Sequence, residues 1–247
     1  MKSAVPPQRL RARYSACPAA PILCFLLVLP CGLRAQSAGT SGTPLTAVQN
    51  YRIGRDLEAG GRSAEAEQYY NEAVRICLDE VARSEAGRDT YTAITWALQR
   101  QKKYAEVISW AEQGLGLFAD EYRILETMGE AYFYLNDYDR SLNCMQRYTN
   151  AVPRGERTSV AYFFIAEIFR LRRQYYHADI AYTTALRLDP GVPLWWYRLA
   201  TVQEALGDYA VAAESFGRAL RLNPDYAEAS AGLARVRERL NQGPAVR

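Results

Sequence analysis

The chain has 247 residues, of which 49% are apolar and 23% are charged, the composition of a globular protein rather than of a disordered or collagen-like one. Its 30 basic and 27 acidic residues give a formal net charge of +3, and five of the basic residues lie within residues 1–35, which contain no acidic residue. The remainder holds 25 basic and 27 acidic residues, a near-neutral balance that argues against a nucleic-acid-binding surface.

Residues 1–35 have the pattern of a secretory signal peptide. A basic start that contains Lys2 and three arginines precedes an uncharged stretch over residues 14–33, whose most apolar part is residues 22–29. A small residue follows, so we expect cleavage near Ala35–Gln36 and an exported protein that is periplasmic or associated with the cell envelope.

Two alternatives remain open for this segment. It is long enough to act as an uncleaved anchor, because about 20 uncharged residues can span a bilayer. It also contains Cys17, Cys24 and Cys31, which allow a lipoprotein, although the residues before them match a lipidation site poorly. A membrane contact is therefore expected only through an uncleaved or lipidated N-terminus. Only Cys77 and Cys144 lie beyond it, too few for a disulfide-stapled scaffold.

From residue 47 onward the chain repeats itself. Residues 36–46 are small and polar with interspersed Gly and Pro, which predicts a flexible linker. The clearest copies are 34 residues apart: Ala178-x3-Tyr182-x2-Ala185-Leu186-x-Leu188-Asp189-Pro190 recurs as Ala212-x3-Phe216-x2-Ala219-Leu220-x-Leu222-Asn223-Pro224.

The second copy resembles the tetratricopeptide repeat, in which two antiparallel helices occupy 34 residues. The residues that carry this resemblance are Trp196, Leu199, Gly207, Tyr209, Ala212, Phe216, Ala219 and Pro224. The chain departs from the family pattern at Ala200, where the family has glycine, and at Gln203, where it has tyrosine. The resemblance implies an all-α protein, a right-handed solenoid whose helix pairs share one continuous core.

The same pattern, moved along the chain, predicts about five helix-turn-helix units over residues 47–241. The units are expected to start near Ala47, Arg88, Tyr122, Ser159 and Pro193, followed by a capping helix over 227–241 and a tail over 242–247. Their spacings of 41, 34, 37 and 34 residues are unequal. We expect the seven extra residues to lengthen the second helix of the first unit, and the three extra residues around Gly155 to lie in a loop.

No residue pattern typical of an active site, a cofactor site or a metal centre is found. His177 is the only histidine, and one histidine cannot supply a usual zinc site. Gly60–Gly61 lacks the Lys-Ser or Lys-Thr that follows in a phosphate-binding loop. Glu126 and Glu130 have the spacing of an acid–base pair on one helix, but we interpret them as an acidic strip on a solvated groove. We expect a non-enzymatic protein.

The two cysteines beyond the signal segment are expected to stay unpaired. Cys77 falls in the first unit and Cys144 in the third, and repeats contact only their neighbours. The two residues should therefore lie about 20 Å apart, beyond the reach of about 7 Å that a disulfide allows between Cα atoms. We interpret them as buried small hydrophobic residues.

In the family that the chain resembles, the first helix of each unit lines the inner, concave groove that binds the partner. The resemblance implies that this groove contains aromatic residues, which are typical of binding hot spots, and charges of both signs. The candidate groove residues are Tyr51, Arg55, Trp96, Arg100, Arg123, Glu126, Glu130, Phe133, Tyr134, Phe163, Glu167, Arg170 and Tyr197. The Lys and Asn positions with which one subclass of the family holds a C-terminal carboxylate are occupied by other residues here.

The sequence thus supports a non-catalytic adaptor that binds a partner protein or peptide in this groove, in cell-envelope assembly or secretion, with no role for nucleic acid. A second hypothesis is a transporter-accessory protein that binds a small hydrophobic ligand or lipid in the aromatic groove. A third is a homo-oligomer in a structural envelope assembly, which rests on Trp195 and Tyr176 being exposed.

Overall fold

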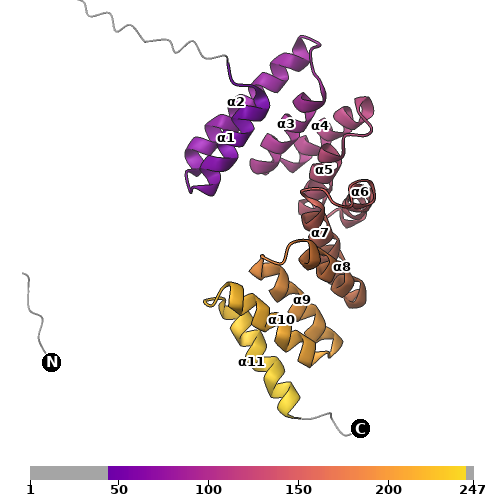
Figure 1. The fold of residues 1–247 in the computed structure, drawn as a ribbon. Coiled ribbons are helices and arrows are strands. Elements are labelled where there is room, and N and C mark those ends of the chain that lie inside the picture. Colours follow the sequence, from indigo (N-terminus) through magenta and orange to yellow (C-terminus); the bar gives the residue numbers. More distant parts are fainter. Residues whose placement is uncertain (1–43, 243–247) are drawn as a thin grey trace, which may run out of the picture. The chain divides into compact units, whose positions relative to one another are not determined.

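The computed structural model describes residues 44–242, so the predicted signal peptide, the cleavage point, most of the predicted linker and nearly all of the tail lie outside the described residues. The described residues form eleven helices and no strand (Figure 1). Their bounds are α1 Ala47–Ala59, α2 Ser63–Ala82, α3 Arg88–Arg100, α4 Tyr104–Leu117, α5 Tyr122–Tyr134, α6 Tyr138–Ala151, α7 Thr158–Leu171, α8 Tyr175–Leu188, α9 Pro193–Leu206, α10 Tyr209–Leu222 and α11 Ala227–Asn241.

The helices are arranged as consecutive pairs, which confirms the predicted solenoid. Each odd-numbered helix from α1 to α9 contacts the even-numbered helix that follows it, and each even-numbered helix contacts the next first helix. First helices also touch directly from α1 to α3, from α3 to α5 and from α5 to α7. The last helix, α11, covers α10 and so closes the C-terminal end of the stack (Figure 1). None of the described helices is both long and apolar enough to cross a bilayer.

The turn inside every unit has the same backbone geometry. In the turn that follows each first helix, one residue adopts a positive φ. The backbone amide of the next residue donates to the carbonyl five residues before it, which is the hydrogen-bond pattern of a Schellman motif. The residues with positive φ are Gly61, Lys102, Asn136, Arg173 and Gly207. Glycine and asparagine, which favour this conformation, occupy three of the five positions, whereas Lys102 and Arg173 take it up without the side-chain type that favours it.

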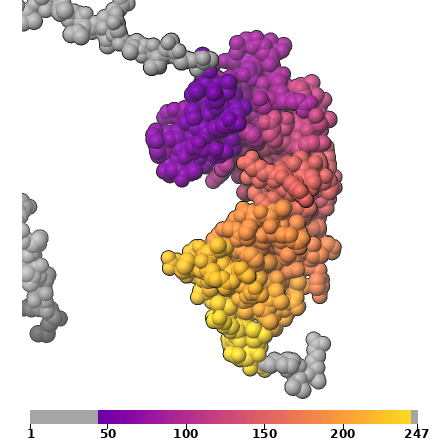
Figure 2. Space-filling model, viewed as in Figure 1, coloured from indigo at the N-terminus to yellow at the C-terminus, as the bar shows by residue number. Residues whose placement is uncertain are grey.

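Small residues lie where two helices approach each other closely. A methyl group added at Gly54 would lie 2.6 Å from Cε1 of Tyr70, and one added at Gly129 would lie 3.0 Å from Cβ of Cys144. The recurring alanines of the second helices, such as Ala178 and Ala212, are completely buried. In the space-filling view, segments that follow one another in the chain lie in contact (Figure 2).

The two irregular spacings have the predicted structural outcomes. The second helix of the first unit, α2, has 20 residues, whereas the second helices α4, α6, α8 and α10 have 14. The loop that joins α6 to α7, residues 152–157, is two residues longer than the loop that joins α8 to α9, residues 189–192, so it contains most of the insertion. This loop contains Arg157, a residue of the candidate site.

Three other expectations are tested by side-chain burial. Cys77 and Cys144 are buried and unpaired, as expected. His177 is exposed at the start of α8, where its ring lies 5.2 Å from that of Phe169. Tyr176 is 73% exposed, but the expectation that Trp195 is exposed is wrong, because this α9 side chain stacks on Phe163 of α7 and only 7% of the residue is accessible.

Candidate partner-binding cavity

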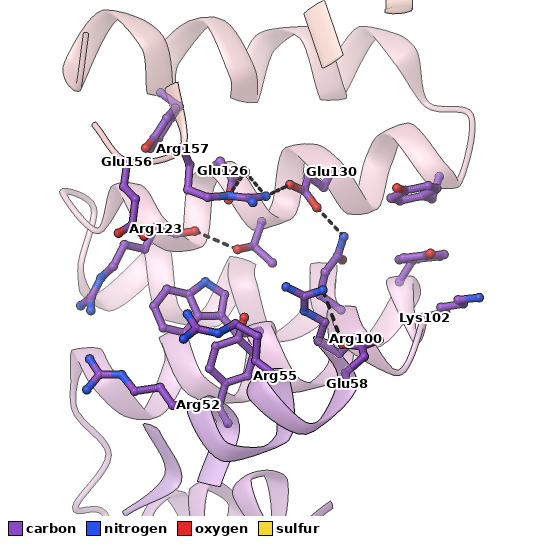
Figure 3. A pocket seen from close by; sticks show the side chains of 17 residues that line it. Arg52, Arg55, Glu58, Arg100, Lys102, Arg123, Glu126, Glu130, Glu156 and Arg157 are labelled. Carbon is purple, nitrogen blue, oxygen red and sulfur yellow. Dashed lines mark hydrogen bonds and ion pairs between the residues drawn. The ribbon is translucent and has the colours of Figure 1, made fainter. Parts of the chain in front are cut away.

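A cavity of about 480 Å³ lies along the first helices α1, α3 and α5 (Figure 3). Ten of its seventeen lining residues are charged, and most of the others are aromatic or amide side chains. The lining residues are Tyr51, Arg52, Arg55, Glu58, Trp96, Gln99, Arg100, Lys102, Tyr104, Arg123, Glu126, Thr127, Glu130, Tyr134, Tyr148, Glu156 and Arg157. The cavity therefore unites three repeats and the loop between α6 and α7.

One wall of the cavity is aromatic. The rings of Tyr51 and Trp96 lie 5.0 Å apart, and the guanidinium of Arg123 lies 5.8 Å from the centre of the Trp96 ring. Farther along the cavity, Tyr104 and Tyr134 stack with 4.8 Å between their ring centres. These rings are held by their neighbours, so they offer a rigid, partly exposed surface to a ligand.

Glu126 and Glu130 form the most deeply buried ionic group of the cavity. Only 4% of Glu126 is accessible, and Glu130 is also buried. The guanidinium of Arg157 donates to both carboxylates, 2.9 Å from Oε1 of Glu126, and the side-chain amide of Gln99 donates to Glu130 at 3.0 Å (Figure 3). The expectation of a solvated acidic strip is therefore wrong, because Arg157 covers both carboxylates from the loop.

The loop holds Arg157 in this position by local hydrogen bonds. The amide of Gly155 donates to the hydroxyl of Thr158 at 2.9 Å, and that hydroxyl donates to the carbonyl of Val152 at 2.6 Å. Arg157 lies directly before the first residue of α7, so this closed turn directs its side chain back toward α5 (Figure 3).

One arginine is shared by two buried carboxylates, and this has a consequence for Glu126. Its pKa is raised well above the ordinary value, first because burial disfavours the ionised form and second because the carboxylate of Glu130 is adjacent. Arg157 opposes both effects without cancelling them. Glu126 therefore holds a proton more firmly than a surface glutamate does.

The rim of the cavity is basic but is largely neutralised by acidic neighbours. Arg55 pairs with Asp56 at 3.0 Å and Arg100 with Glu58 at 3.5 Å. Arg123 pairs with two acids, Glu121 at 2.7 Å and Asp89 at 3.2 Å. Within the described part of the chain, Arg52 and Lys102 have no ion-pair partner, and both are exposed to solvent.

A second ionic group lies on α7 and α9, outside this cavity. Glu167 is buried and accepts hydrogen bonds from Arg170 on its own helix, at 2.7 Å, and from the hydroxyl of Tyr182 on α8. The guanidinium of Arg198 on α9 approaches the same carboxylate at 3.5 Å. Two arginines thus contact one carboxylate here, whereas at Arg157 one arginine contacts two carboxylates.

The structure brings eight of the thirteen candidate groove residues into the cavity and places five elsewhere. Tyr51, Arg55, Trp96, Arg100, Arg123, Glu126, Glu130 and Tyr134 line it. Glu167 and Arg170 belong to the second ionic group. The other three pack against neighbouring rings: Phe163 stacks on Trp195 at 5.2 Å, Phe133 contacts Phe164 at 5.0 Å, and Tyr197 lies 5.1 Å from Tyr226.

Sequence reasoning missed several lining residues, of which Arg157 is the most important. The unequal spacing of 37 residues located the insertion around Gly155, but nothing in the pattern indicated that the loop returns toward α5. Arg52 and Glu58 lie on α1 beside predicted groove positions and were also missed. In the described residues no group of three or more His, Cys, Asp and Glu side chains is placed to hold a metal ion.

Comparisons with known proteins agree with the repeat architecture. Residues 193–226 match the family model of the tetratricopeptide repeat. The protein bimA of Emericella nidulans is 26% identical over 193 residues, which are 77% of this chain and 22% of that protein, so the chain spans about a fifth of its relative.

Among solved structures, MamA from Desulfovibrio magneticus RS-1 superimposes with a TM-score of 0.54 at 18% identity, covering 75% of this chain and 99% of that one. Another MamA crystal structure gives a TM-score of 0.57 at 15% identity, with coverages of 71% and 97%. At these identities the likeness establishes the fold alone.

Proposed function

We propose that this tetratricopeptide-repeat protein is a non-catalytic scaffold that binds a peptide segment of a partner protein in the cavity along α1, α3 and α5. The observation that carries the proposal is the combination of a rigid aromatic wall, formed by Tyr51 and Trp96, with charged side chains from three repeats around one space. Protein segments supply both the apolar surface and the hydrogen-bonding groups that such a lining matches.

The composition of the lining favours a peptide over a hydrophobic small molecule or lipid. An apolar ligand would remove water from the carboxylates and guanidinium groups of the cavity without replacing the lost hydrogen bonds, which is unfavourable. A peptide replaces them with its own backbone and side-chain groups. Self-assembly through exposed aromatic rings has lost one of its two supports, because Trp195 is buried.

We further propose that the protein acts outside the cytoplasm, in cell-envelope assembly or secretion. The support is the basic and then apolar pattern of residues 1–35. The mass and the N-terminal sequence of the protein purified from its native cells test this directly. A first residue at Gln36 supports export with cleavage, whereas an intact Met1 in the cytosolic fraction overturns it.

The binding proposal is tested by crosslinking the full chain in its native cells and identifying the proteins that co-purify. We expect Trp96→Ala to abolish recovery of the specific partner, because it removes the central ring of the aromatic wall. The matched control is Tyr176→Ala, which removes an exposed ring on α8, away from the cavity. A partner that both variants retain would show that the cavity is not the binding surface, and an extracted lipid without any protein would support the small-molecule alternative.

A further inference from the structure

The loop between α6 and α7 differs from its equivalents in where its last side chain goes. The residue directly before the first helix is Glu121 for α5, Arg157 for α7 and Val192 for α9. Glu121 bonds to Arg123 on its own helix, and Val192 packs against the apolar core. Arg157 instead reaches back to the preceding first helix, α5, where it bonds to a residue 31 positions earlier in the chain.

The loop is built in a way that holds this position. Six residues, 152–157, join α6 to α7, whereas four join α4 to α5 and four join α8 to α9. Gly155 has no room for a side chain, because an added methyl group would lie 2.6 Å from Cγ1 of Val152 and 2.9 Å from the hydroxyl oxygen of Tyr148. This close packing and the two hydrogen bonds of the Thr158 hydroxyl fix the direction in which the chain enters α7.

Arg157 closes the cavity on the side of α7. Its guanidinium bonds to Glu126 at 2.9 Å and to Glu130, and none of the described residues after Arg157 lines the cavity (Figure 3). A segment seated in the cavity can continue toward α7 only by displacing this arginine or by rising out of the cavity over it. Displacement leaves the buried carboxyl groups without their cation, and rising out gives up the central contacts, so both are unfavourable.

The inner face beyond the loop offers a segment little to bind, because its side chains already contact each other. The ring of Phe163 stacks on that of Trp195, and only 7% of Trp195 is accessible. The carboxylate of Glu167 is buried and accepts hydrogen bonds from Arg170 and from the hydroxyl of Tyr182. The candidate groove residues on α7 thus have their partners within the chain.

We propose that Arg157 ends the partner-binding surface, so that a bound segment contacts α1, α3 and α5 and does not continue along α7 and α9. This inference rests on the proposed peptide-binding function and specifies the length of ligand that the cavity takes. Three neighbouring helices with axes about 8–10 Å apart span about 16–20 Å, and an extended chain advances about 3.3 Å per residue. The bound part of the partner is therefore about five or six residues long.

The test uses a random library of 12-residue peptides displayed on phage and selected on the immobilised full chain. Only peptides whose binding is lost with Trp96→Ala are kept. Photoreactive benzoylphenylalanine then replaces Tyr134 on α5 or Tyr197 on α9, two tyrosines that precede and follow the loop. An extended peptide of this length spans about 40 Å, enough to reach α9 if nothing stops it. We expect the peptides to crosslink at the Tyr134 site and not at the Tyr197 site.

The possible results separate this inference from the proposed function. Crosslinking at the Tyr197 site, or at neither site, would overturn the inference and leave the proposed function intact. Failure to select any peptide that depends on Trp96 would overturn both. Trimming a selected peptide to its best six residues should keep its Kd within about twofold, since residues beyond the loop add no contact. A continued loss of affinity on trimming from twelve residues would also count against the inference.

Removal of the arginine should lengthen the bound segment. Arg157→Ala combined with Glu130→Gln removes the guanidinium without leaving an ionised carboxylate in its place, because Glu126 has a raised pKa and holds its proton. We expect this double variant to gain crosslinking at the Tyr197 site. Arg154→Ala changes an exposed arginine of the same loop that does not line the cavity, and it should keep the original pattern.

Circular dichroism verifies that the double variant is folded. A folded double variant that still crosslinks only at the Tyr134 site would show that Arg157 is not the barrier. If the double variant does not fold, the crosslinking of the chain with Arg157 in place still tests where the bound segment ends.

Discussion

At the scale of single residues, Glu126 shows how burial changes the chemistry of a side chain whose type is unremarkable. A glutamate on the first helix of a repeat ordinarily faces solvent, but this one is enclosed by Glu130 on α5, by Arg157 from the loop and by Tyr148 on α6. The single guanidinium cannot compensate two buried carboxylates. The raised pKa of Glu126 thus links the stability of the fold to pH.

The expected pH dependence has a definite sign. The folded chain keeps the proton on Glu126 above pH 4.5, the ordinary pKa, where the unfolded chain has already released it. The contribution of this group to stability is therefore present at low pH and is lost as the pH rises through the raised pKa. We expect Glu126→Gln to gain stability relative to the unmodified chain as the pH rises, as measured by urea unfolding between pH 4.5 and pH 8. A constant difference across this range would contradict the assignment.

At the scale of helices, close contacts rather than helix propensity decide which glycines matter. Gly232 on α11 faces the buried ring of Phe216 on α10, and a methyl group added there would overlap the ring. Gly217 on α10 has open space, since an added methyl group would meet only the flexible end of Arg221 at 3.5 Å. Glycine is thus required by a close helix contact at Gly232 but not at Gly217.

The two glycines give a matched pair of substitutions. Gly232→Ala should destabilise the chain by about 1–3 kcal/mol, because α11 must move away from α10 to accommodate the methyl group. Gly217→Ala should stabilise it by up to about 1 kcal/mol, because alanine favours the helical backbone. Thermal and urea unfolding measure both effects. Equal effects of the two substitutions would show that α11 does not dock on α10 as described.

At the scale of the whole molecule, the stack of helix pairs makes stability a local property. Each pair contacts only its neighbours, so the loss of one interface need not open the others. The first unit is the clearest place to test this, because it ends the stack and its Gly54 lies against the ring of Tyr70.

Hydrogen exchange followed by mass spectrometry resolves such local opening. Gly54→Ala should increase exchange in α1 and α2 and should leave α9, α10 and α11 unchanged. Gly116→Ala on α4 is the control, since an added methyl group there meets no atom within 4 Å. A uniform increase along the whole chain after Gly54→Ala would show instead that the repeats unfold as one cooperative unit.

Much of this architecture was predictable from the sequence because its causes are local. The recurring alanines and aromatic residues define where helices touch, and the spacings of 41 and 37 residues identified a longer second helix and an inserted loop. Most of the cavity's aromatic and basic residues on α1, α3 and α5 were predicted from the resemblance to the repeat family, whose groove positions were transferred by register. The position of Phe163 outside the cavity was not predicted. Register indicates the face of a helix on which a residue lies, but not whether a neighbouring ring, here that of Trp195, covers that face.

The environment of the charged residues required the packed helices. Arg157 lies 31 residues from Glu126 in sequence, and only the turn at Gly155 brings its guanidinium to the buried carboxylates. The number of arginines that contact each buried carboxylate depends likewise on which side chains from neighbouring repeats reach it. Helix period and turn position follow from interactions between residues close in sequence, whereas burial, ionisation and charge balance follow from contacts between segments that the repeat pattern does not relate.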